Sequence, residues 1–364
     1  MRKPHPAIAR AEAFCASLGA RIPVLLAPMA GACPPSLSIA VAGAGGLGAC
    51  GAVVMQPAAI AEWAREFRSG CRDGAFQMNL WIPDPAPVRD RGVEDAVRAF
   101  LERFGPAVPA EAGDYTRPEF TAQCEALLEA GPAAISSIMG LYPAAFVERM
   151  KARGIRWIAT ATTVTEARLA VAAGADAVVA QGMEAGGHRG AFDASRAERE
   201  LIGLFALLPA IVDAVSVPVI AAGGIADPRA VASALILGAS AVQVGTGFLR
   251  CPEARLPSAW TDAIGASLPE QTLISRVFSG RPGRSIETAY VRAATAPGAP
   301  PPAAYPVQSG LTAAMRVRAL KENVLDGLQA WAGQSAAQAR ARPAAQVAKE
   351  LWEGARAMLE PGSS

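Results

Sequence analysis

The chain has 364 residues, of which 52% are hydrophobic, and a formal net charge of +2. This length accommodates either two domains or one (β/α)8 barrel with extensions, and the apolar content suffices to bury a large core. Charges of both signs are scattered along the sequence without a basic stripe, which argues against nucleic acid as a partner.

The sequence also bears on compartment and membrane insertion. Six cysteines are widely spaced and include no Cys-x-x-Cys pair, so neither a disulfide framework nor a zinc knuckle is predicted. Arg10 and Glu12 occur before any apolar segment has formed, which argues against a signal peptide. Residues 22–61 carry no charge, but prolines and glycines interrupt them too often for a spanning helix. We therefore expect a cytoplasmic protein without a membrane segment.

Short apolar runs alternate with helical patterns through most of the chain. The runs are apolar throughout, as is typical of strands covered on both faces. Helix start signals lie between them: Thr165-Glu166 precedes one helix, and Asp227-Pro228 places a capping side chain before a proline at the first helical position of another. The predicted strands are residues 23–29, 46–54, 76–82, 134–139, 157–162, 177–181, 217–222 and 241–245.

Two of the strand–helix units resemble each other. Residues 157–182 and 219–247 each contain a strand, an alanine-rich helix, a Gly-Ala-x-Ala-Val joint and a second strand. Repeated units of this kind, with right-handed crossovers, indicate a parallel sheet. Eight strands favour a closed TIM-type (β/α)8 barrel over an open sheet, so the predicted fold class is α/β.

Two segments depart from the alternating pattern. Residues 83–132 lie between the third and fourth predicted strands and contain a predicted helix at 93–104. After Arg250 no further strand is predicted, and the chain reads as a mostly helical extension packed over the barrel mouth. The Pro- and Ala-rich residues 296–306 are either a linker or a loop folded over that mouth. We therefore expect a barrel domain at 1–250 and a substrate-covering extension at 251–364. The last helix of the extension either stays with it or packs back against the barrel.

One of only two histidines is the first candidate for catalysis. His188 follows the strand at 177–181 in a glycine-rich loop, whereas His5 lies near the N-terminus. Parallel α/β proteins place their chemistry at the carboxyl ends of strands, and histidine titrates near neutrality. The alternative is a core histidine, but a position among three glycines and an arginine favours a catalytic role for His188.

The last two predicted strands end in glycine-rich turns. Gly223-Gly224 follows one, and Gly245-Thr246 follows the other. Glycines allow backbone N–H groups to approach a ligand closely, and barrels often bind phosphate at this place. Turns that are tight for packing reasons are the alternative, although two such turns on consecutive units favour a phosphate site.

Neutral polar residues accompany other strands. Met29 follows Ala27-Pro28 at the end of the first strand, Gln77 and Asn79 lie on the third, and Gln181 ends the sixth. Amides donate and accept hydrogen bonds without a net charge, which suits a flavin or nucleotide ring. The alternative is that they satisfy backbone groups at the barrel rim.

Neither a metal site nor a cysteine nucleophile is predicted. Glu184 and His188 are four residues apart, but Gly186 and Gly187 oppose a helix that would bring them to one face, and no further histidine or cysteine completes a ligand set. Cys33 lies near the end of the first strand without a recognisable base, which favours a buried thiol over a nucleophile.

Taken in order, the motifs of this chain resemble those of nitronate monooxygenases, formerly called 2-nitropropane dioxygenases. The likeness extends from about residue 20 to beyond residue 340, and Trp331-Ala332-Gly333-Gln334 resembles a motif of the class I bacterial members. The Gln181-to-His188 block is the specific part, whereas the Gly-Gly turns are not. The motifs are Ala27-Pro28-Met29, Gly45-Gly46-Leu47-Gly48, Asn79, Ala180-Gln181-Gly182-x-Glu184-Ala185-Gly186-Gly187-His188-Arg189-Gly190, Ala222-Gly223-Gly224-Ile225 and Gln243-x-Gly245-Thr246.

The resemblance implies a barrel that holds non-covalent FMN. His188 would be the catalytic residue beside the reactive face of the flavin, and Tyr305 would line the substrate pocket. The family often carries a second tyrosine and then a lysine after this Tyr-Pro pair, where this chain has Ser309 and Ala313. The residues that the resemblance assigns to the flavin are Ala27, Pro28, Met29, Asn79, Gln181, Gly186, Gly187, Gly223 and Gly224, with Gln243, Val244, Gly245 and Thr246 at the ribityl phosphate.

The implied reaction is oxidative denitrification of alkyl nitronates, and optionally of nitroalkanes, with O2. It gives a carbonyl compound and nitrite through a flavosemiquinone. Two other functions stay open: an FMN-dependent NAD(P)H:quinone or enoyl-thioester reductase on the same barrel, and a flavin-free phosphate-binding isomerase or lyase. The irregular glycines at 43–48 do not form a dinucleotide fingerprint.

Overall fold

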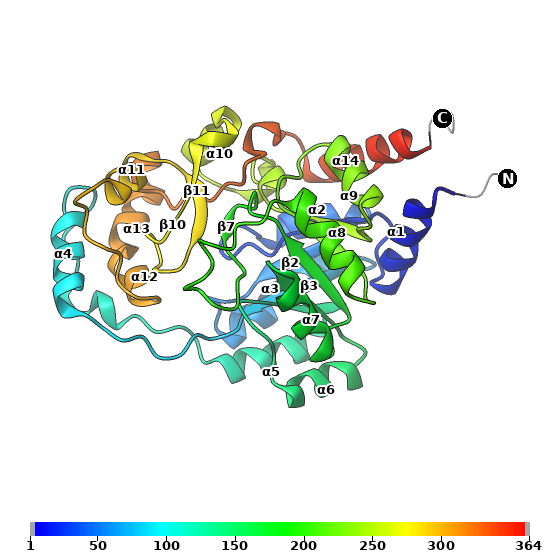
Figure 1. The fold of residues 1–364 in the computed structure, drawn as a ribbon, viewed down its shortest axis with the longest axis horizontal. Helices are drawn as coiled ribbons and strands as arrows, with labels where there is room; N and C mark the ends of the chain where they lie inside the picture. The colour runs from blue at the N-terminus through cyan, green and yellow to red at the C-terminus, as the bar shows by residue number, and fades with distance from the viewer. Residues whose placement is uncertain (1–3, 361–364) are drawn as a thin grey trace.

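The computed structural model describes residues 4–360 and contains a closed barrel of eight parallel strands (Figure 1). The strands are neighbours in the order β1-β2-β3-β4-β5-β6-β8-β9, and pairing of β1 with β9 closes the ring. Each of them overlaps one predicted strand, so the predicted TIM-type barrel is confirmed. Their bounds are β1 (Val24–Leu26), β2 (Leu47–Gly51), β3 (Ala75–Trp81), β4 (Ala134–Ile138), β5 (Arg156–Ala161), β6 (Ala177–Gln181), β8 (Val219–Ala222) and β9 (Ala241–Val244).

Helices surround this barrel. The α9 cap is as predicted, since the Asp227 side chain accepts a hydrogen bond from the Ala230 N–H. The cap of α7 is Thr163 rather than Thr165, because the Thr163 hydroxyl reaches the Glu166 N–H. The last helix, α14, packs against α9 and α2. The surrounding helices are α1 (Pro6–Ser17), α2 (Pro35–Gly43), α3 (Pro57–Gly70), α5 (Phe120–Ala130), α6 (Ala144–Ala152), α7 (Val164–Ala172), α8 (Leu204–Ala214), α9 (Pro228–Ile236) and α14 (Ala344–Leu359).

The remaining helices belong to the insertion after β3 and to the segment after β9. Figure 1 shows α4, α11, α12 and α13 together at the end of the molecule away from α1 and α14. The insertion contains α4 (Arg91–Leu101) and η1 (Ala110–Asp114). The later segment contains η2 (Thr246–Phe248), η3 (Pro252–Ala254), α10 (Ser258–Ala266), η4 (Pro269–Gln271), α11 (Ala289–Thr295), α12 (Val307–Leu311), α13 (Ala313–Glu322), η5 (Leu325–Gly327) and η6 (Ala336–Gln338).

The prediction that no strand follows Arg250 is wrong. β10 (Thr272–Ser275) and β11 (Gly283–Ile286) form an antiparallel pair, and β11 also pairs with β7 (Gly187–His188). The β11 sequence carries an arginine and a serine, so it lacks the apolar run that signals a buried strand. It is a strand because of its partners on both sides. This sheet joins the extension to the loop that carries His188.

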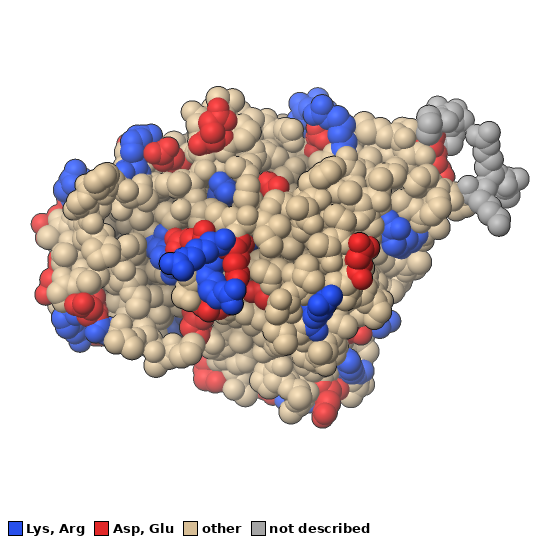
Figure 2. Space-filling view, in the orientation of Figure 1, with Lys and Arg blue, Asp and Glu red and all other residues tan. Residues whose placement is uncertain are grey.

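The insertion and the extension share one apolar core. Val97 and Leu101 of α4 pack with Phe278, Tyr290 and other buried residues of the extension. The domain boundary at residue 250 therefore stays a prediction, and this core would assign α4 to the smaller domain. Within residues 4–360 no helix is long and apolar enough to cross a membrane. On the face drawn in Figure 2, charges of both signs are interspersed over a mostly uncharged surface.

A glycine-to-alanine pair tests how closely the insertion packs on the extension. A Cβ on Gly310 of α12 would lie 1.9 Å from the Ala112 carbonyl oxygen of η1, whereas a Cβ on Gly43 of α2 would meet nothing within 4 Å. Gly310→Ala is therefore expected to lower the free energy of unfolding by about 1–3 kcal/mol. Gly43→Ala should range from neutral to about 1 kcal/mol stabilising. Urea unfolding measures both changes, and equal effects would contradict the close packing.

Candidate active site

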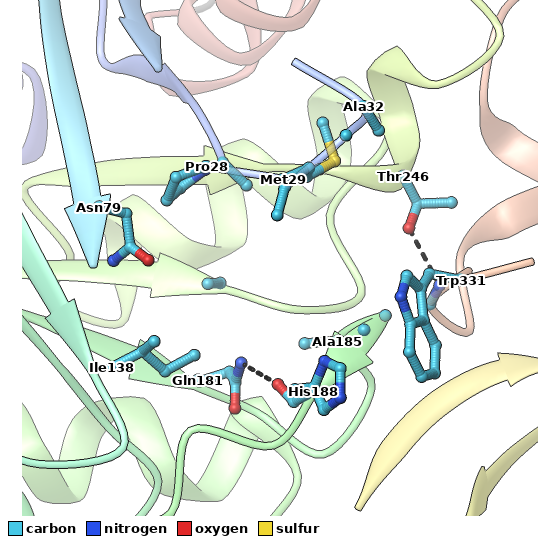
Figure 3. A pocket seen from close by; sticks show the side chains of 18 of the residues that line it. Pro28, Met29, Ala32, Asn79, Ile138, Gln181, Ala185, His188, Thr246 and Trp331 are labelled. Carbon is cyan, nitrogen blue, oxygen red and sulfur yellow. Dashed lines mark hydrogen bonds between the residues drawn. The ribbon is translucent and has the colours of Figure 1, made fainter. Parts of the chain in front are cut away.

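The carboxyl ends of the barrel strands surround a cavity of about 410 Å³. The first-strand loop lies across this cavity from Gln181 and His188 (Figure 3). Nearly every residue that the sequence assigns to the site lines it: Ala27, Pro28, Met29, Asn79, Gln181, Gly186, Gly187, His188, Gly223, Gly224, Gln243, Gly245 and Thr246.

Two predicted site residues do not line the cavity. The Val244 side chain is buried in the core around the barrel, because neighbouring residues of a strand face opposite sides and Gln243 faces inward. Tyr305 lies one layer away, with its ring centroid 6.1 Å from that of Trp81, which does line the cavity.

The loop after β1 is held by a buried thiol. The Cys33 Sγ accepts a hydrogen bond from the Met29 N–H at 3.3 Å and donates one to the Ala27 carbonyl oxygen at 3.1 Å. Burial raises the pKa of the Cys33 thiol to about 12, which disfavours the reactive thiolate. Cys33 thus supports the shape of the loop, in agreement with the expected buried thiol.

His188 is held by contacts to Ser279, Trp81 and Trp331. Its Nε2 lies 2.7 Å from the Ser279 Oγ, and its ring contacts Trp81 and Trp331 edge-on, with centroid distances of 4.6 and 4.8 Å. Gln181 holds the backbone: its Nε2 donates to the His188 carbonyl oxygen, and its Oε1 accepts from the Gly190 N–H. The Gln181 amide thus fixes the backbone conformation of the loop from His188 to Gly190.

The environment of His188 differs from the sequence expectation of a group that titrates near neutrality. Burial, and after it the positive charges of Arg117, Arg281 and Arg316, together lower the pKa of His188 to about 3. The imidazole is therefore neutral at physiological pH. The sequence does not show this because Ser279, Trp331 and the three arginines come from the insertion and the extension, far from His188 in the chain.

These arginines are charged residues of the candidate site that sequence reasoning missed. Arg117 and Arg316 line the cavity, and Arg281 forms an ion pair with Asp84 at 2.7 Å. No local motif marks any of them. Trp81 also escaped notice, although its place at the end of the strand that carries Asn79 was a usable signal.

Glycines that line the cavity allow close contacts between neighbouring backbone segments. Gly223 has a φ of +107°, and a Cβ there would lie 3.0 Å from the Ala185 nitrogen. A Cβ on Gly186 would lie 2.5 Å from the Gly333 nitrogen, and that same N–H donates to the Thr246 Oγ1 at 3.0 Å. Only glycine, which has no Cβ, permits these backbone segments to lie so close to one another.

The amides on the strand ends are partly engaged. The Gln77 Nε2 donates to the Gln243 Oε1 at 3.1 Å, and the Asn79 Nδ2 donates to the Ser136 Oγ at 3.0 Å. These bonds orient one donor, the Gln243 amide nitrogen, and one acceptor, the Asn79 amide oxygen, for use by a ligand.

No metal-binding group is apparent in the part of the chain that the structure describes: residues 4–360 contain no cluster of three His, Cys, Asp or Glu side chains. The Glu184 carboxylate, which also lines the cavity, accepts a hydrogen bond from the Leu204 N–H at the start of α8. This carboxylate therefore caps a backbone N–H at the start of α8.

Comparisons with known proteins agree with this site. A family model described as nitronate monooxygenase matches residues 13–354. A nitronate monooxygenase of Pseudomonas aeruginosa is 39% identical over 347 residues, which cover 94% of this chain and 98% of the relative. One from Paraburkholderia phytofirmans is 38% identical, with 92% of each chain covered.

Solved structures point the same way. A nitroalkane oxidase from Streptomyces ansochromogenes superposes with a TM-score of 0.85 at 33% identity and covers 94% of this chain and 98% of its own. FabK from Thermotoga maritima superposes with a TM-score of 0.74 at 26% identity, covering 96% and 97%. The family match over most of the chain and the full-length relatives show that this chain belongs to the nitronate monooxygenase family.

Proposed function

We propose that this protein catalyses FMN-dependent oxidative denitrification of alkyl nitronates with O2, which yields a carbonyl compound and nitrite. The observation that carries the proposal is the neutral His188 beside arginines at a cavity that the family motifs line. A nitronate is an anion, and positive charges next to an uncharged imidazole suit its binding.

The residues of the cavity fit FMN. The Gln243 amide nitrogen and the Asn79 amide oxygen offer a donor and an acceptor, which match the N–H and C=O groups of a flavin pyrimidine ring. Gly223, Gly224, Gly245 and Thr246 line the same cavity, and glycine has no side chain to cover the backbone N–H groups that a phosphate would use. Met29, which lies across the cavity from His188, would also contact the flavin (Figure 3). When bound, FMN supplies one-electron redox chemistry toward the substrate and oxygen, which protein side chains lack.

His188 would act on protons and orientation. In the neutral imidazole, Nε2 either accepts a hydrogen bond from the Ser279 hydroxyl or donates one to the Ser279 Oγ, depending on the tautomer. With a nitroalkane as substrate, His188 would take the acidic C–H proton, and the imidazolium would be stabilised by the nitronate anion that forms beside it. With a nitronate already supplied, no proton has to be removed, and the ring only orients the substrate.

The second candidate is an FMN-dependent reductase that uses a nicotinamide cofactor. It would use the same barrel and the same cavity for the flavin. This candidate and the nitronate reaction differ in which reagent reduces the flavin, so one experiment separates them.

The function is tested by anaerobic mixing of the purified protein with one reagent at a time. The protein as isolated, or after addition of FMN, should have a flavin spectrum, and propionate 3-nitronate alone should bleach part of the flavin absorbance within the turnover time. Rapid full reduction by NADH, with no response to the nitronate, would favour the reductase. A protein that binds no flavin would contradict both.

The proton-transfer role predicts a substrate-dependent effect of His188→Asn. Asparagine keeps a hydrogen-bonding group but cannot accept the proton. We expect kcat/KM for nitroethane to fall by about 10²–10⁴-fold and that for ethylnitronate to fall by less than about 10-fold. Nitrite release measures both rates. Equal losses with the two substrates would contradict the base role.

A further inference from the structure

The two nitrogens of the His188 ring have different surroundings. Nε2 lies 2.7 Å from the Ser279 Oγ, whereas Nδ1 has no hydrogen-bond partner among residues 4–360. Because His188 lines the cavity, Nδ1 is the ring nitrogen that remains available to a ligand there. The neutral ring carries one proton, and the nitrogen that holds it is set by the role that the Ser279 hydroxyl takes toward Nε2.

The Ser279 hydroxyl also bonds to the backbone two residues further along. The Arg281 N–H donates to the Ser279 Oγ at 3.2 Å, and the hydroxyl donates to the Arg281 carbonyl oxygen, also at 3.2 Å. A hydroxyl donates one hydrogen bond and accepts two. With its proton on the Arg281 carbonyl, the Ser279 Oγ has one acceptor position left for Nε2, and Nε2 then carries the ring proton. In this arrangement the Arg281 N–H, the Arg281 carbonyl, the hydroxyl and Nε2 all have partners.

The opposite tautomer satisfies fewer of these groups. If the Ser279 hydroxyl donates to Nε2 instead, the ring proton lies on Nδ1, for which residues 4–360 offer no acceptor. The Arg281 carbonyl loses its hydroxyl donor at the same time. Ser279 is only 2% exposed, so water does not readily replace the bond that is lost at this carbonyl. The surroundings therefore favour the ring that is protonated on Nε2.

The backbone keeps Ser279 beside the histidine. Ser279 lies in the turn between β10 and β11, and β11 pairs with β7, so that Gly283 is opposite His188. The Arg189 N–H donates to the Pro282 carbonyl oxygen at 2.9 Å and extends this pairing by one residue. The same sheet thus fixes both partners of the contact between Oγ and Nε2.

We propose that Ser279 is a positioning residue that holds the neutral His188 with its proton on Nε2, so that Nδ1 is the atom that takes the C–H proton of a nitroalkane. This inference rests on the proposed function. In that step the C–H electron pair forms the C=N bond of the nitronate, and the proton moves to Nδ1. Nε2 keeps its hydrogen bond to the Ser279 Oγ throughout, so the positive ring retains an acceptor although the charges of three arginines act on it.

The tautomer is measured by long-range proton–nitrogen correlation spectra at neutral pH, on the full chain with nitrogen-15-labelled histidine and added FMN. A protonated ring nitrogen resonates far upfield of an unprotonated one, and comparison with His188→Asn assigns the signals. We expect a protonated Nε2 and an unprotonated Nδ1. Ser279→Ala removes the acceptor of the Nε2 proton and should give a mixture of tautomers. A wild-type proton on Nδ1, or an unchanged tautomer in Ser279→Ala, would overturn the inference.

The same variant should distinguish two substrates. Loss of a hydrogen bond to the positive ring should lower kcat/KM for nitroethane by about 10–100-fold. The value for ethylnitronate, from which no proton is removed, should fall by less than about 3-fold. Equal losses on both substrates, or no loss on either, would argue for a merely structural Ser279 and overturn the inference.

The matched control is Ser275→Ala. Ser275 lies on β10 of the same hairpin, and its buried hydroxyl has no hydrogen-bond partner within the described chain. Its loss should leave the tautomer as it is and change neither rate by more than about 2-fold. A wild-type enzyme that oxidises ethylnitronate but not nitroethane would overturn the inference and leave the proposed function standing. One that oxidises neither would refute the proposed function, and the wild-type tautomer would still show whether Ser279 holds the proton on Nε2.

Discussion

The neutral state of the His188 imidazole, which burial and then the charge of three guanidinium groups maintain, is the constraint on which the site depends. Arg117 comes from the insertion after β3, and Arg281 and Arg316 come from the extension after β9. They reach His188 because β11 pairs with β7 and because the insertion shares a core with the extension. The barrel alone would leave His188 at an open mouth. The added segments make its surroundings positive and bury it.

This arrangement has a consequence for stability and for ligand choice. Since the pKa of His188 in the folded chain is about 3, below its ordinary value of 6.5, the unfolded chain binds the proton more readily between these two pH values. The histidine therefore destabilises the fold as pH falls through that window. An anion bound beside the arginines would offset part of their charge, so occupation of the cavity and proton uptake by His188 favour each other.

The sequence predicts the barrel well because its strands are apolar on both faces and are separated by capped helices, as at Asp227-Pro228. It also predicts most of the cavity lining, because strand ends such as Gln181 and Gly245 meet at one edge by topology. The assignment of Val244 to the cavity is not supported, because residues 243–246 were assigned together although neighbouring residues of a strand face opposite sides. β11 failed because Gly283–Ile286 is a strand only through its partners. Arg117 and Arg316 failed because an arginine in a helix or loop looks like an ordinary surface residue until tertiary packing buries it.

The most direct test of the account is the titration of His188 by nuclear magnetic resonance. The chain has only two histidines, so the imidazole signals of His188 are assigned by comparison with His188→Asn. The account predicts that His188 stays neutral from pH 8 down to about pH 5, because burial and the arginines hold its pKa near 3. A titration midpoint near 6.5 would contradict it.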